Sequence, residues 1–277
     1  MSSPITRRRF LAIGAGALAA GGLGGYSFWE SRKLEVRSIA IRLAGLPAGF
    51  DGCRIAFLSD FHHGWFVSSD FLASVVAATN GLRPDIVLLG GDYVDSEPVC
   101  IQPVMDLLGR LRAPLGVYAV QGNRDIAANR VLTSRELVRQ GIHELTNSGR
   151  WIERNGSRVW LCGLDDSTIG SPDIPAALDK LPRDAAAILV THNPEVVESL
   201  DDPRLLLVCC GHTHGGQINI PLLGRPLLFS SACRKYAQGL VQSAHSKIFT
   251  TTGVGSFFPP LRFRCPPEIA LLTLARQ

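Results

Sequence analysis

The chain has 277 residues, 46% of them hydrophobic, and a formal net charge of +4. That length suits one α/β domain with a well-buried core. Arg7, Arg8 and Arg9 supply three of the four charges, which leaves +1 from Glu30 onward. A nearly neutral domain lacks the footprint of bulk nucleic-acid binding. The seven cysteines are odd in number and have no Cys-x-x-Cys spacing, which excludes a disulfide framework and a zinc finger.

A basic cluster followed by an uncharged stretch opens the chain. In TRRRFLAIGAGALAAGGLGGYSFW the three arginines come first, and no charge follows from Phe10 to Trp29. Such an order is typical of a twin-arginine export signal, with Ala17-Leu18-Ala19 as the candidate cleavage site. An uncleaved membrane anchor and a buried helix of the domain are the alternatives. We expect residues 1–30 to be a signal or anchor and residues 31–277 to form the domain.

Apolar runs and helical patterns alternate along the rest of the chain. We expect strands over 54–58, 85–92, 116–123, 185–194 and 204–214, with two more in SKIFTTTGVG and EIALLTL. We expect helices over 69–79, 104–111 and 129–140, and a hairpin turn at Asn155-Gly156. Early β-α-β units followed by a hairpin imply an α/β fold with mixed sheets covered by helices.

Polar side chains gather at the carboxyl ends of five of these strands. The five ends are Ser59-Asp60-Phe61-His62, Gly91-Asp92, Gly122-Asn123, Thr191-His192 and Gly211-His212-Thr213-His214. Ligands of α/β sheets bind beyond such ends, and a period of two places both members of Asp-x-His or His-x-His on one side. Each element alone fits a cap or a core histidine. Two Asp, one Asn and four His together predict a metal centre.

The donor types indicate which ions this centre takes. Mixed oxygen and imidazole donors suit Mn²⁺, Fe or Zn²⁺ better than Ca²⁺ or a thiolate zinc site. There are enough donors for two divalent ions if one carboxylate bridges them. Two ions about 3.5–4 Å apart clamp the oxygens of an in-line phosphoryl displacement and generate a hydroxide nucleophile near neutral pH. We therefore expect a hydrolase that binds two divalent ions, with Mn²⁺ as the preferred ion.

Five segments, SDFHHG, GGDYVD, QGNRD, VTHNPE and GHTHGGQ, resemble in order the motifs of the calcineurin-like metallophosphoesterase superfamily. The resemblance covers about residues 53–255, and GHTHGGQINIP with the leader is most similar to the YkuE/YaeI type of bacterial phosphodiesterase. It implies two mixed β-sheets packed as a sandwich flanked by helices. It also implies a first metal held by Asp60, His62 and His214, a bridging Asp92, and a second metal held by Asn123, His192 and His212.

The chain departs from the superfamily at Arg124. Most members carry Gly-Asn-His there, and that histidine is credited with protonating the leaving group. Arginine stays protonated and cannot act as a general acid, but it can clamp a phosphate oxygen and stabilise transition-state charge. We therefore expect Arg124, Asp92 and Asn123 to be catalytic, on substrates with good leaving groups such as a pyrophosphate or an aryl diester.

Three alternatives concern these roles. Arg124 can instead form a surface ion pair with Asp125, and His63 or His245 can supply the acid. The apolar segment 218–229, with Trp65 and Phe66, predicts a lip facing lipid, the alternative being ordinary core and loop packing.

The leading function is a phosphodiesterase or pyrophosphatase acting on a lipid-linked or small envelope phosphoester, exported and either periplasmic or tethered to the membrane. GNRD also resembles the UDP-2,3-diacylglucosamine pyrophosphatases of lipid A synthesis, whose cytoplasmic substrate requires the cytoplasmic face of the membrane. The third function is a phosphate-binding scaffold without turnover. As partners we expect the phosphoester substrate and a membrane reached through the N-terminal segment, and no nucleic acid.

Overall fold

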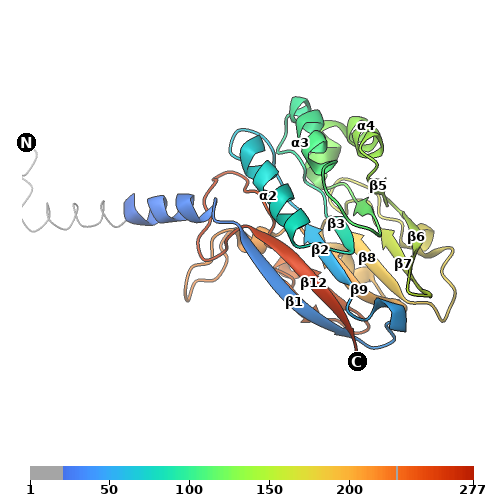
Figure 1. The fold of residues 1–277 in the computed structure, drawn as a ribbon. Helices are drawn as coiled ribbons and strands as arrows, with labels where there is room; N and C mark the ends of the chain where they lie inside the picture. Colours follow the sequence, from blue (N-terminus) through green and yellow to red (C-terminus); the bar gives the residue numbers. More distant parts are fainter. Residues whose placement is uncertain (1–20, 229) are drawn as a thin grey trace, which may run out of the picture.

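The computed structural model describes residues 21–228 and 230–277, which form two six-stranded sheets packed face to face (Figure 1). The first sheet has the order β1 (Glu35–Leu43), β12 (Glu268–Arg276), β2 (Arg54–Leu58), β3 (Ile86–Leu89), β4 (Val117–Ala119) and β5 (His143–Glu144). The second has the order β10 (Gly239–Gln242), β11 (Lys247–Thr250), β9 (Leu205–Cys210), β8 (Ala187–Thr191), β7 (Ser157–Gly163) and β6 (Ser148–Arg154). Both sheets mix parallel and antiparallel pairs. The predicted α/β sandwich of two mixed sheets is confirmed.

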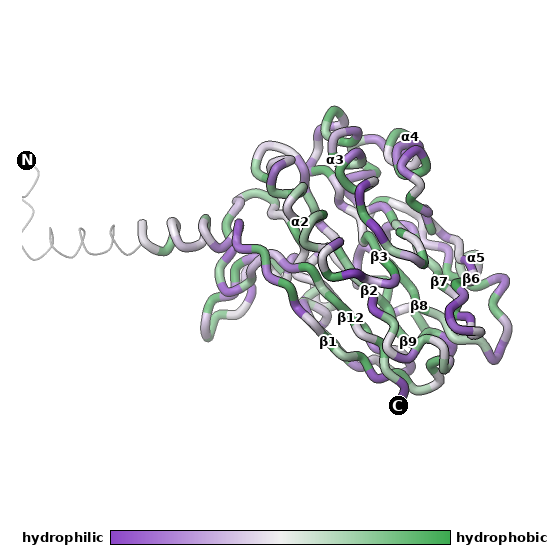
Figure 2. The backbone as a smooth tube through the Cα atoms, in the orientation of Figure 1, coloured by the Kyte–Doolittle hydropathy of each residue, from purple (hydrophilic) through white to green (hydrophobic). Residues whose placement is uncertain are grey.

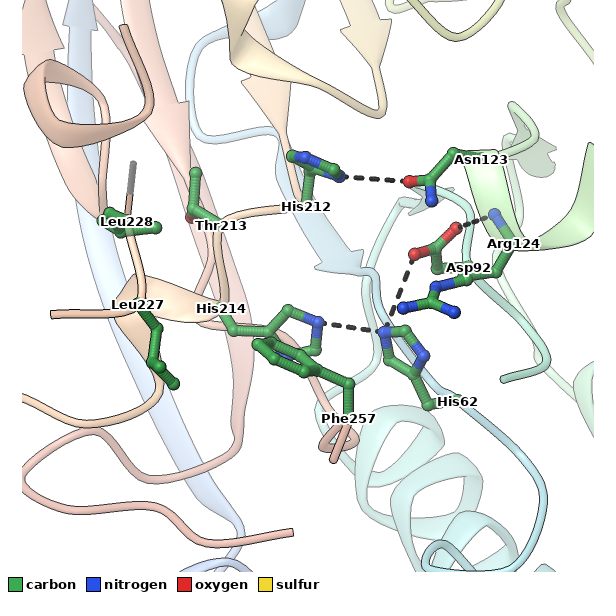
Figure 3. Close-up of a pocket in the computed structure, with 10 residues that line it drawn as sticks. All are labelled: His62, Asp92, Asn123, Arg124, His212, Thr213, His214, Leu227, Leu228 and Phe257. Carbon is green, nitrogen blue, oxygen red and sulfur yellow. Dashed lines mark hydrogen bonds and ion pairs between the residues drawn. The ribbon is translucent and has the colours of Figure 1, made fainter. Parts of the chain in front are cut away.

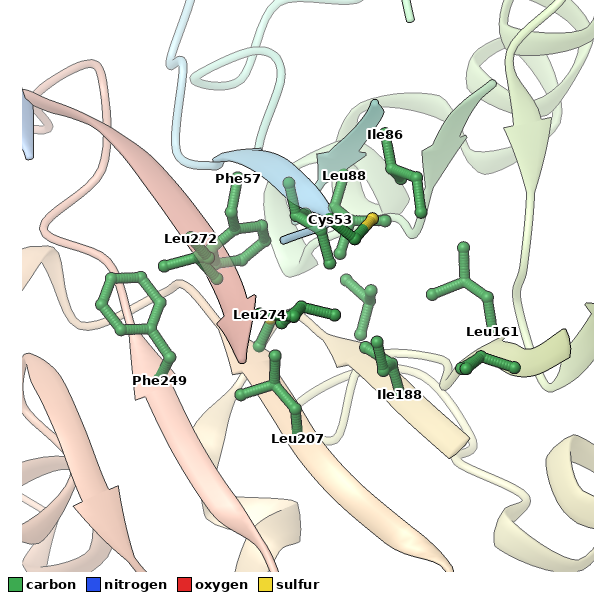
Figure 4. Close-up of a cluster of buried hydrophobic side chains, with 14 of the residues drawn as sticks. Cys53, Phe57, Ile86, Leu88, Leu161, Ile188, Leu207, Phe249, Leu272 and Leu274 are labelled. Atoms are coloured by element: carbon green, nitrogen blue, oxygen red, sulfur yellow. The ribbon is translucent and has the colours of Figure 1, made fainter. Parts of the chain in front are cut away.

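The main core lies between the sheets (Figure 4). In β2, Ile55 and Phe57 enter this core, whereas Ala56 and Leu58 face the helices on the other side of the sheet. Both faces are therefore covered, and this is why the central strands are continuous apolar runs rather than alternating ones (Figure 2). Each large side chain buried in this way contributes about 1.5–3 kcal/mol.

Helices cover the outer faces of both sheets. They are α2 (Ser69–Gly81), α3 (Ile101–Leu108), α4 (Asn123–Arg139), α5 (Ile174–Leu178) and α6 (Ser231–Lys235), with 3-10 turns η1 (Ala48–Phe50), η2 (Pro98–Cys100), η3 (Pro194–Ser199) and η4 (His214–Gly216). Ser68 begins α2 by accepting a hydrogen bond from Phe71 N at 3.3 Å, a common N-cap arrangement. The α2 to α4 helices pack on the first sheet, where they position the loops that leave β2, β3 and β4.

The local predictions had mixed outcomes. Asn155 and Gly156 both have positive φ and connect the antiparallel β6 and β7, so the hairpin is confirmed. The segment Asn123–Arg139 is kinked at Asn129, whose backbone is not helical and whose Oδ1 accepts the Leu132 N–H at 2.9 Å, so the helix predicted from residue 129 is present. A further helical stretch that was not predicted precedes it from Asn123, and β4 ends at Ala119. The cause is a cap, because the Asp125 carboxylate accepts the Gly122 N–H at 2.9 Å and starts the helix there. Asn123 is thus the first residue of a helix.

The N-terminal residues of the described part are helical over 21–30. Within residues 21–228 and 230–277, no helix has the length and apolar character needed to cross a bilayer. Most of the predicted signal or anchor, including the cleavage site at 17–19, lies outside the described residues. Ser27 and Glu30 are buried, and the Glu30 carboxylate accepts the backbone N–H of Cys265 at 2.7 Å. The fold thus begins before residue 31.

Candidate active site

The carboxyl ends of the central strands in both sheets meet at one edge of the sandwich. β2, β3 and β4 are parallel in the first sheet, and β8 and β9 are parallel in the second. Beyond them lies a cavity of about 180 Å³ (Figure 3), lined by His62, Asp92, Asn123, Arg124, His212, Thr213, His214, Leu227, Leu228 and Phe257. The predicted position of the site at the strand ends is the observed one.

Left-handed backbone turns bring the side chains into this cavity. Five of the expected metal donors have positive φ although none is glycine: Asp60 (58°), His62 (48°), Asp92 (54°), His212 (68°) and His214 (49°). Such conformations cost about 1–3 kcal/mol each and persist only where the surroundings enforce them. The turns fold each strand end back on itself, so that side chains from separate strands point at one another.

One group of donors combines Asp60 with two histidines. The Nε2 atoms of His62 and His214 are 2.9 Å apart, and His214 Nε2 lies 3.4 Å from Asp60 Oδ1. The donor atoms of the three residues all lie within 4.8 Å of one another. At most 2% of each residue is exposed. This is the trio that the motifs implied for the first metal.

A second group combines Asp60, Asp92 and His192, also within 4.8 Å. His192 Nε2 lies 3.3 Å from Asp92 Oδ2, while its Nδ1 donates to the Gly90 carbonyl at 2.7 Å. That backbone bond fixes the ring so that Nε2 faces the cavity, the usual arrangement for a histidine that binds a metal. Asp60 is therefore common to both groups, and Asp92 Oδ2 also lies 3.6 Å from His62 Nε2, so that Asp92 contacts a histidine of each group.

Asn123 and His212 complete the set beside His192. Asn123 Oδ1 is 3.2 Å from His192 Nε2 and 3.1 Å from His212 Nδ1 (Figure 3). The structure thus brings together all seven residues that the sequence predicted as ligands, from five separate segments. Which metal each residue binds stays a prediction.

The electrostatics of the set fit divalent cations. Two pairs of imidazole nitrogens face each other, His62 with His214 and His192 with His212, the latter pair at 3.2 Å. Lone pairs so placed repel unless a proton or a cation lies between them. Carboxylate, amide and imidazole donors together match the preferences of Mn²⁺, Fe and Zn²⁺. The residues present therefore fit the metals.

Burial and neighbouring charges set the protonation of these donors. Burial lowers the pKa of His212, and burial with the adjacent His62 lowers that of His214, so both rings are neutral, as ligation requires. Burial opposes the ionisation of Asp92, yet the neighbouring His192 holds its pKa well below the usual range. Burial likewise disfavours a charged His192, but the carboxylate of Asp92 raises the pKa of the ring to about 10.

The sequence matches a known family and has relatives along nearly its full length. Residues 53–216 match the family described as calcineurin-like phosphoesterase. The chain belongs to this family. It is 32% identical over 280 residues to the uncharacterized metallophosphoesterase YkuE of Bacillus subtilis, covering 98% of each chain. It is 33% identical to the phosphodiesterase YaeI of Escherichia coli, covering 98% of this chain and 99% of that one.

A third relative extends the comparison beyond bacteria. The chain is 30% identical to a transmembrane protein with metallophosphoesterase domain of Danio rerio, over 87% of this chain and 57% of that one. As a calcineurin-like phosphoesterase, the protein is a metallophosphoesterase that hydrolyses phosphoesters, and its Asp/His clusters are consistent with divalent metals.

Arg124 lies at the mouth of the cavity. Its backbone N–H donates to Asp92 Oδ1 at 2.8 Å, and its guanidinium lies beside Asp92 and His62 (Figure 3). The alternative ion pair with Asp125 is wrong, because Asp125 is buried and accepts backbone N–H groups from Asp92 and Tyr93 instead. No carboxylate in the described part of the chain forms a salt bridge with Arg124.

Neither histidine suggested as a substitute acid reaches the cavity. His63 Nδ1 is 3.2 Å from the Cys100 carbonyl and its Nε2 is 2.9 Å from Ser69 Oγ, so both nitrogens are engaged elsewhere. His245 precedes β11, which runs parallel to β9, and therefore lies at the end of the sheet opposite the site. There it pairs with Asp201 at 3.0 Å.

Three supporting residues escaped the sequence analysis. Asp95 Oδ1 lies 3.5 Å from His62 Nδ1, an atom without a hydrogen bond in the described residues, and it can orient that ring. The Phe257 ring packs on His214 with 4.9 Å between centroids, and Arg262 Nη2 lies 3.3 Å from His214 Nδ1. Asp95 could have been found from its place in GGDYVD. Phe257 and Arg262 lie outside every motif.

Proposed function

We propose that the protein is a two-metal phosphodiesterase or pyrophosphatase acting on a lipid-linked or small envelope phosphoester, with Mn²⁺ as the preferred ion and Fe or Zn²⁺ as alternatives. One observation carries the proposal. Two carboxylate-histidine groups share Asp60, and the guanidinium of Arg124 lies beside them without a carboxylate partner in residues 21–228 and 230–277 (Figure 3). A cation left free at the mouth of such a site is placed for an anionic substrate.

The roles of the residues follow from their positions. Asp60, His62 and His214 would hold one ion, and Asn123, His192 and His212 the other. Asp92, whose Oδ2 lies 3.6 Å from His62 Nε2 and 3.3 Å from His192 Nε2, would bridge them. Bound ions supply Lewis acidity to the phosphoryl oxygens and lower the pKa of a water nucleophile. Arg124 binds a non-bridging phosphoryl oxygen and stabilises the charge that develops on it. Because arginine does not give up its proton at neutral pH, the leaving group departs as an anion.

The N-terminal segment sets the proposed location. Three arginines followed by an uncharged stretch support export by the twin-arginine route, to the periplasm or to a membrane-tethered state. A reporter fused to the C-terminus and assayed for export tests this location. Reporter activity confined to the cytoplasm would favour the alternative, association with the cytoplasmic face.

The activity is tested on the full chain in detergent with Mn²⁺. We expect hydrolysis of bis(4-nitrophenyl) phosphate and a loss of at least 100-fold in kcat for Asp92→Asn, because a charged donor is removed. Asp70→Asn, an exposed acid in the first turn of α2, is the matched control and should keep full activity. Equal activity of Asp92→Asn and wild type would contradict the proposal and favour the phosphate-binding scaffold.

UDP-2,3-diacylglucosamine hydrolysis is the second candidate function. Arg124 on one side of the cavity, with Leu227 and Leu228 on the opposite side (Figure 3), favours it, because a pyrophosphate and acyl chains would meet a cation and apolar side chains. The same preparation is offered this substrate. Release of UMP, lost in Asp92→Asn, would support the second candidate, whereas cleavage of the aryl diester alone would leave the first.

A further inference from the structure

Aromatic side chains stand exposed beside the mouth of the site. Trp65 is 92% exposed, Phe258 is 73% exposed and Phe66 is 42% exposed. The rings of Phe66 and Phe258 lie 6.1 Å apart although their segments are far apart in sequence. Scattered exposed hydrophobic residues are normal, but a cluster from separate segments marks an interaction surface.

The helix over 21–30 adds to the same surface. Tyr26 and Trp29 are 45% and 55% exposed, and Tyr26 packs on Phe263 with 5.9 Å between ring centroids. A cavity of about 300 Å³ joins the end of this helix to the aromatic loop, with Arg32 on one side and Trp65 on the other. The helix and the loop are thus parts of one surface.

A third segment lies next to Phe263. The turn between Ile220 and Gly224 projects Leu222 and Leu223, which are 107% and 78% exposed. Asn219 N donates to the Phe263 carbonyl at 2.9 Å and so holds this turn beside the helix. Helix 21–30 leaves the body at the end of the molecule where these loops project (Figure 1). We name Tyr26, Trp29, Trp65, Leu222, Leu223 and Phe258 the apolar rim.

Positive charges border the apolar rim. Arg32, Lys33, Arg234 and Arg264 are exposed near it, and the Arg32 guanidinium lies 3.7 Å from the Phe28 ring centroid. Tryptophan, tyrosine and leucine flanked by arginine and lysine are the composition of surfaces that lie in a bilayer interface, where the cations attract anionic headgroups.

Several residues of the apolar rim lie close in sequence to residues of the site. Trp65 follows His62 by three residues, Phe258 is the neighbour of Phe257 in the cavity wall, and the Leu222 turn follows His214 in the same loop. A surface on which the rim rested would therefore lie across the mouth of the cavity.

We propose that the apolar rim seats the folded domain on an anionic bilayer surface, with the mouth of the site facing the headgroups. The sequence that precedes the described residues supports this occupant, because it is uncharged from Phe10 and is followed directly by helix 21–30, which carries Tyr26 and Trp29 of the rim. Docking is inferred from the apolar rim alone and does not depend on the proposed function. The further inference that the substrate is a phosphoester in the bilayer surface rests on the proposed function.

The proposal is tested by depth-dependent quenching of Trp65 in the full chain, which separates docking of the domain from tethering by the leader. A Trp29→Phe variant is mixed with vesicles of phosphatidylglycerol and phosphatidylcholine that carry doxyl groups high in the acyl chain. Subtracting the emission of Trp29→Phe/Trp65→Phe isolates Trp65, because Trp151 and Trp160 remain in both. We expect the Trp65 component to fall at least twofold.

The matched control places a tryptophan away from the rim. Val131 is 76% exposed on α4, so in Trp29→Phe/Trp65→Phe/Val131→Trp the new side chain should remain unquenched by the lipid. Trp65 emission unchanged by doxyl lipid, on vesicles that still carry the protein, would overturn the proposal and leave a domain held by its leader alone. Equal quenching of Trp65 and of the tryptophan at position 131 would also overturn it, because the domain would then contact the bilayer without a preferred orientation.

A second readout links docking to turnover. Leu222→Ser/Leu223→Ser, outside the donor set, should raise KM at least tenfold for a phosphodiester presented in vesicles and leave kcat for a soluble aryl diester unchanged. Unchanged KM would count against docking. If the wild type hydrolysed neither substrate, the proposed function would be wrong, and the quenching result would remain valid as evidence on docking.

Discussion

Arg262 Nη2 lies 3.3 Å from His214 Nδ1, and Arg262 is completely buried. The same guanidinium donates to the carbonyls of Thr252 at 2.8 Å and Cys265 at 2.9 Å, and to Ser256 Oγ at 3.0 Å. A guanidinium only donates, so His214 Nδ1 is the acceptor and the ring is held with Nε2 toward the cavity. One buried cation thus orders a loop and orients a metal donor.

Replacing Arg262 by Met should destabilise the fold by about 3–5 kcal/mol, because several buried acceptors lose their donor. Urea unfolding of the metal-free protein measures this. Arg264→Met is the control, since that side chain is exposed two residues further on and should change stability by less than about 0.5 kcal/mol. Equal effects of the two substitutions would show that the network around Arg262 contributes nothing.

Arg124 should act on the phosphoryl group and leave metal binding alone. Its link to Asp92 is the backbone N–H, which alanine, lysine and histidine at this position keep. We expect Arg124→Ala to lower kcat on an aryl diester about 100- to 1,000-fold with unchanged metal affinity, and Arg124→Lys to recover part of the loss. A drop in metal affinity equal to the drop in kcat would contradict this role.

The same position controls which leaving groups are accepted. Arg124→His introduces a group that titrates near neutral pH and can protonate the leaving oxygen. We therefore expect kcat for a methyl ester to rise relative to the aryl ester in Arg124→His. The dependence of log kcat on leaving-group pKa measures the change, and equal slopes for the two proteins would show that no acid is missing in the wild type.

Metal binding should release a proton from His192. Asp92 raises the pKa of this ring to about 10, above the unfolded value near 6.5. In the metal-free protein, the pair therefore contributes stability that is complete below about pH 6.5 and is lost as the pH rises through 10. For Asp92, whose folded pKa is depressed, the contribution is present above its unfolded value of about 3.9 and lost as the pH falls through its folded pKa.

A cation that binds His192 Nε2 must displace that proton, so metal affinity should rise about tenfold per pH unit between pH 6.5 and 8.5. Calorimetry in two buffers of different ionisation enthalpy should count about one proton released per protein from this ring. His192→Gln is the control and should release one proton fewer. A release that is the same in both proteins would mean that the ring is already neutral.

The sequence located the site because of how strands end. Apolar runs that stop at Gly or at Asp and His mark the carboxyl ends of parallel strands, and those ends meet wherever strands are parallel. The donors of His62, Asp92 and His212 could therefore be grouped without a structure. Their left-handed backbone conformation could not be predicted, because no sequence signal marks a positive φ at Asp or His as glycine does elsewhere.

Other features depended on contacts between distant residues. Arg262 meets His214 across 48 positions without a motif around it. Ser27 and Glu30 are buried because backbone N–H groups of the loop at 262–265 donate to the Ser27 carbonyl and the Glu30 carboxylate, whereas their own sequence suggested an export segment. The early start of α4 depends on Asp125, which caps the helix. From the sequence alone, Asp125 was considered only as an ion-pair partner of Arg124. Tertiary contacts decided each case.

Gly211, which directly follows β9, should not tolerate a side chain. A Cβ there would lie 2.6 Å from Asp60 Oδ2 and would overlap Ser59 Oγ. We expect Gly211→Ala to displace Asp60, lower the affinity for metal at least tenfold and cost about 1–3 kcal/mol in stability. Gly81→Ala, at the end of α2 with nothing within 4 Å of the added atom, should keep metal affinity and gain about 0.5–1 kcal/mol. Calorimetric titration with Mn²⁺ and urea unfolding decide between them. Unchanged metal affinity in Gly211→Ala would show that Asp60 is not a donor that both groups depend on.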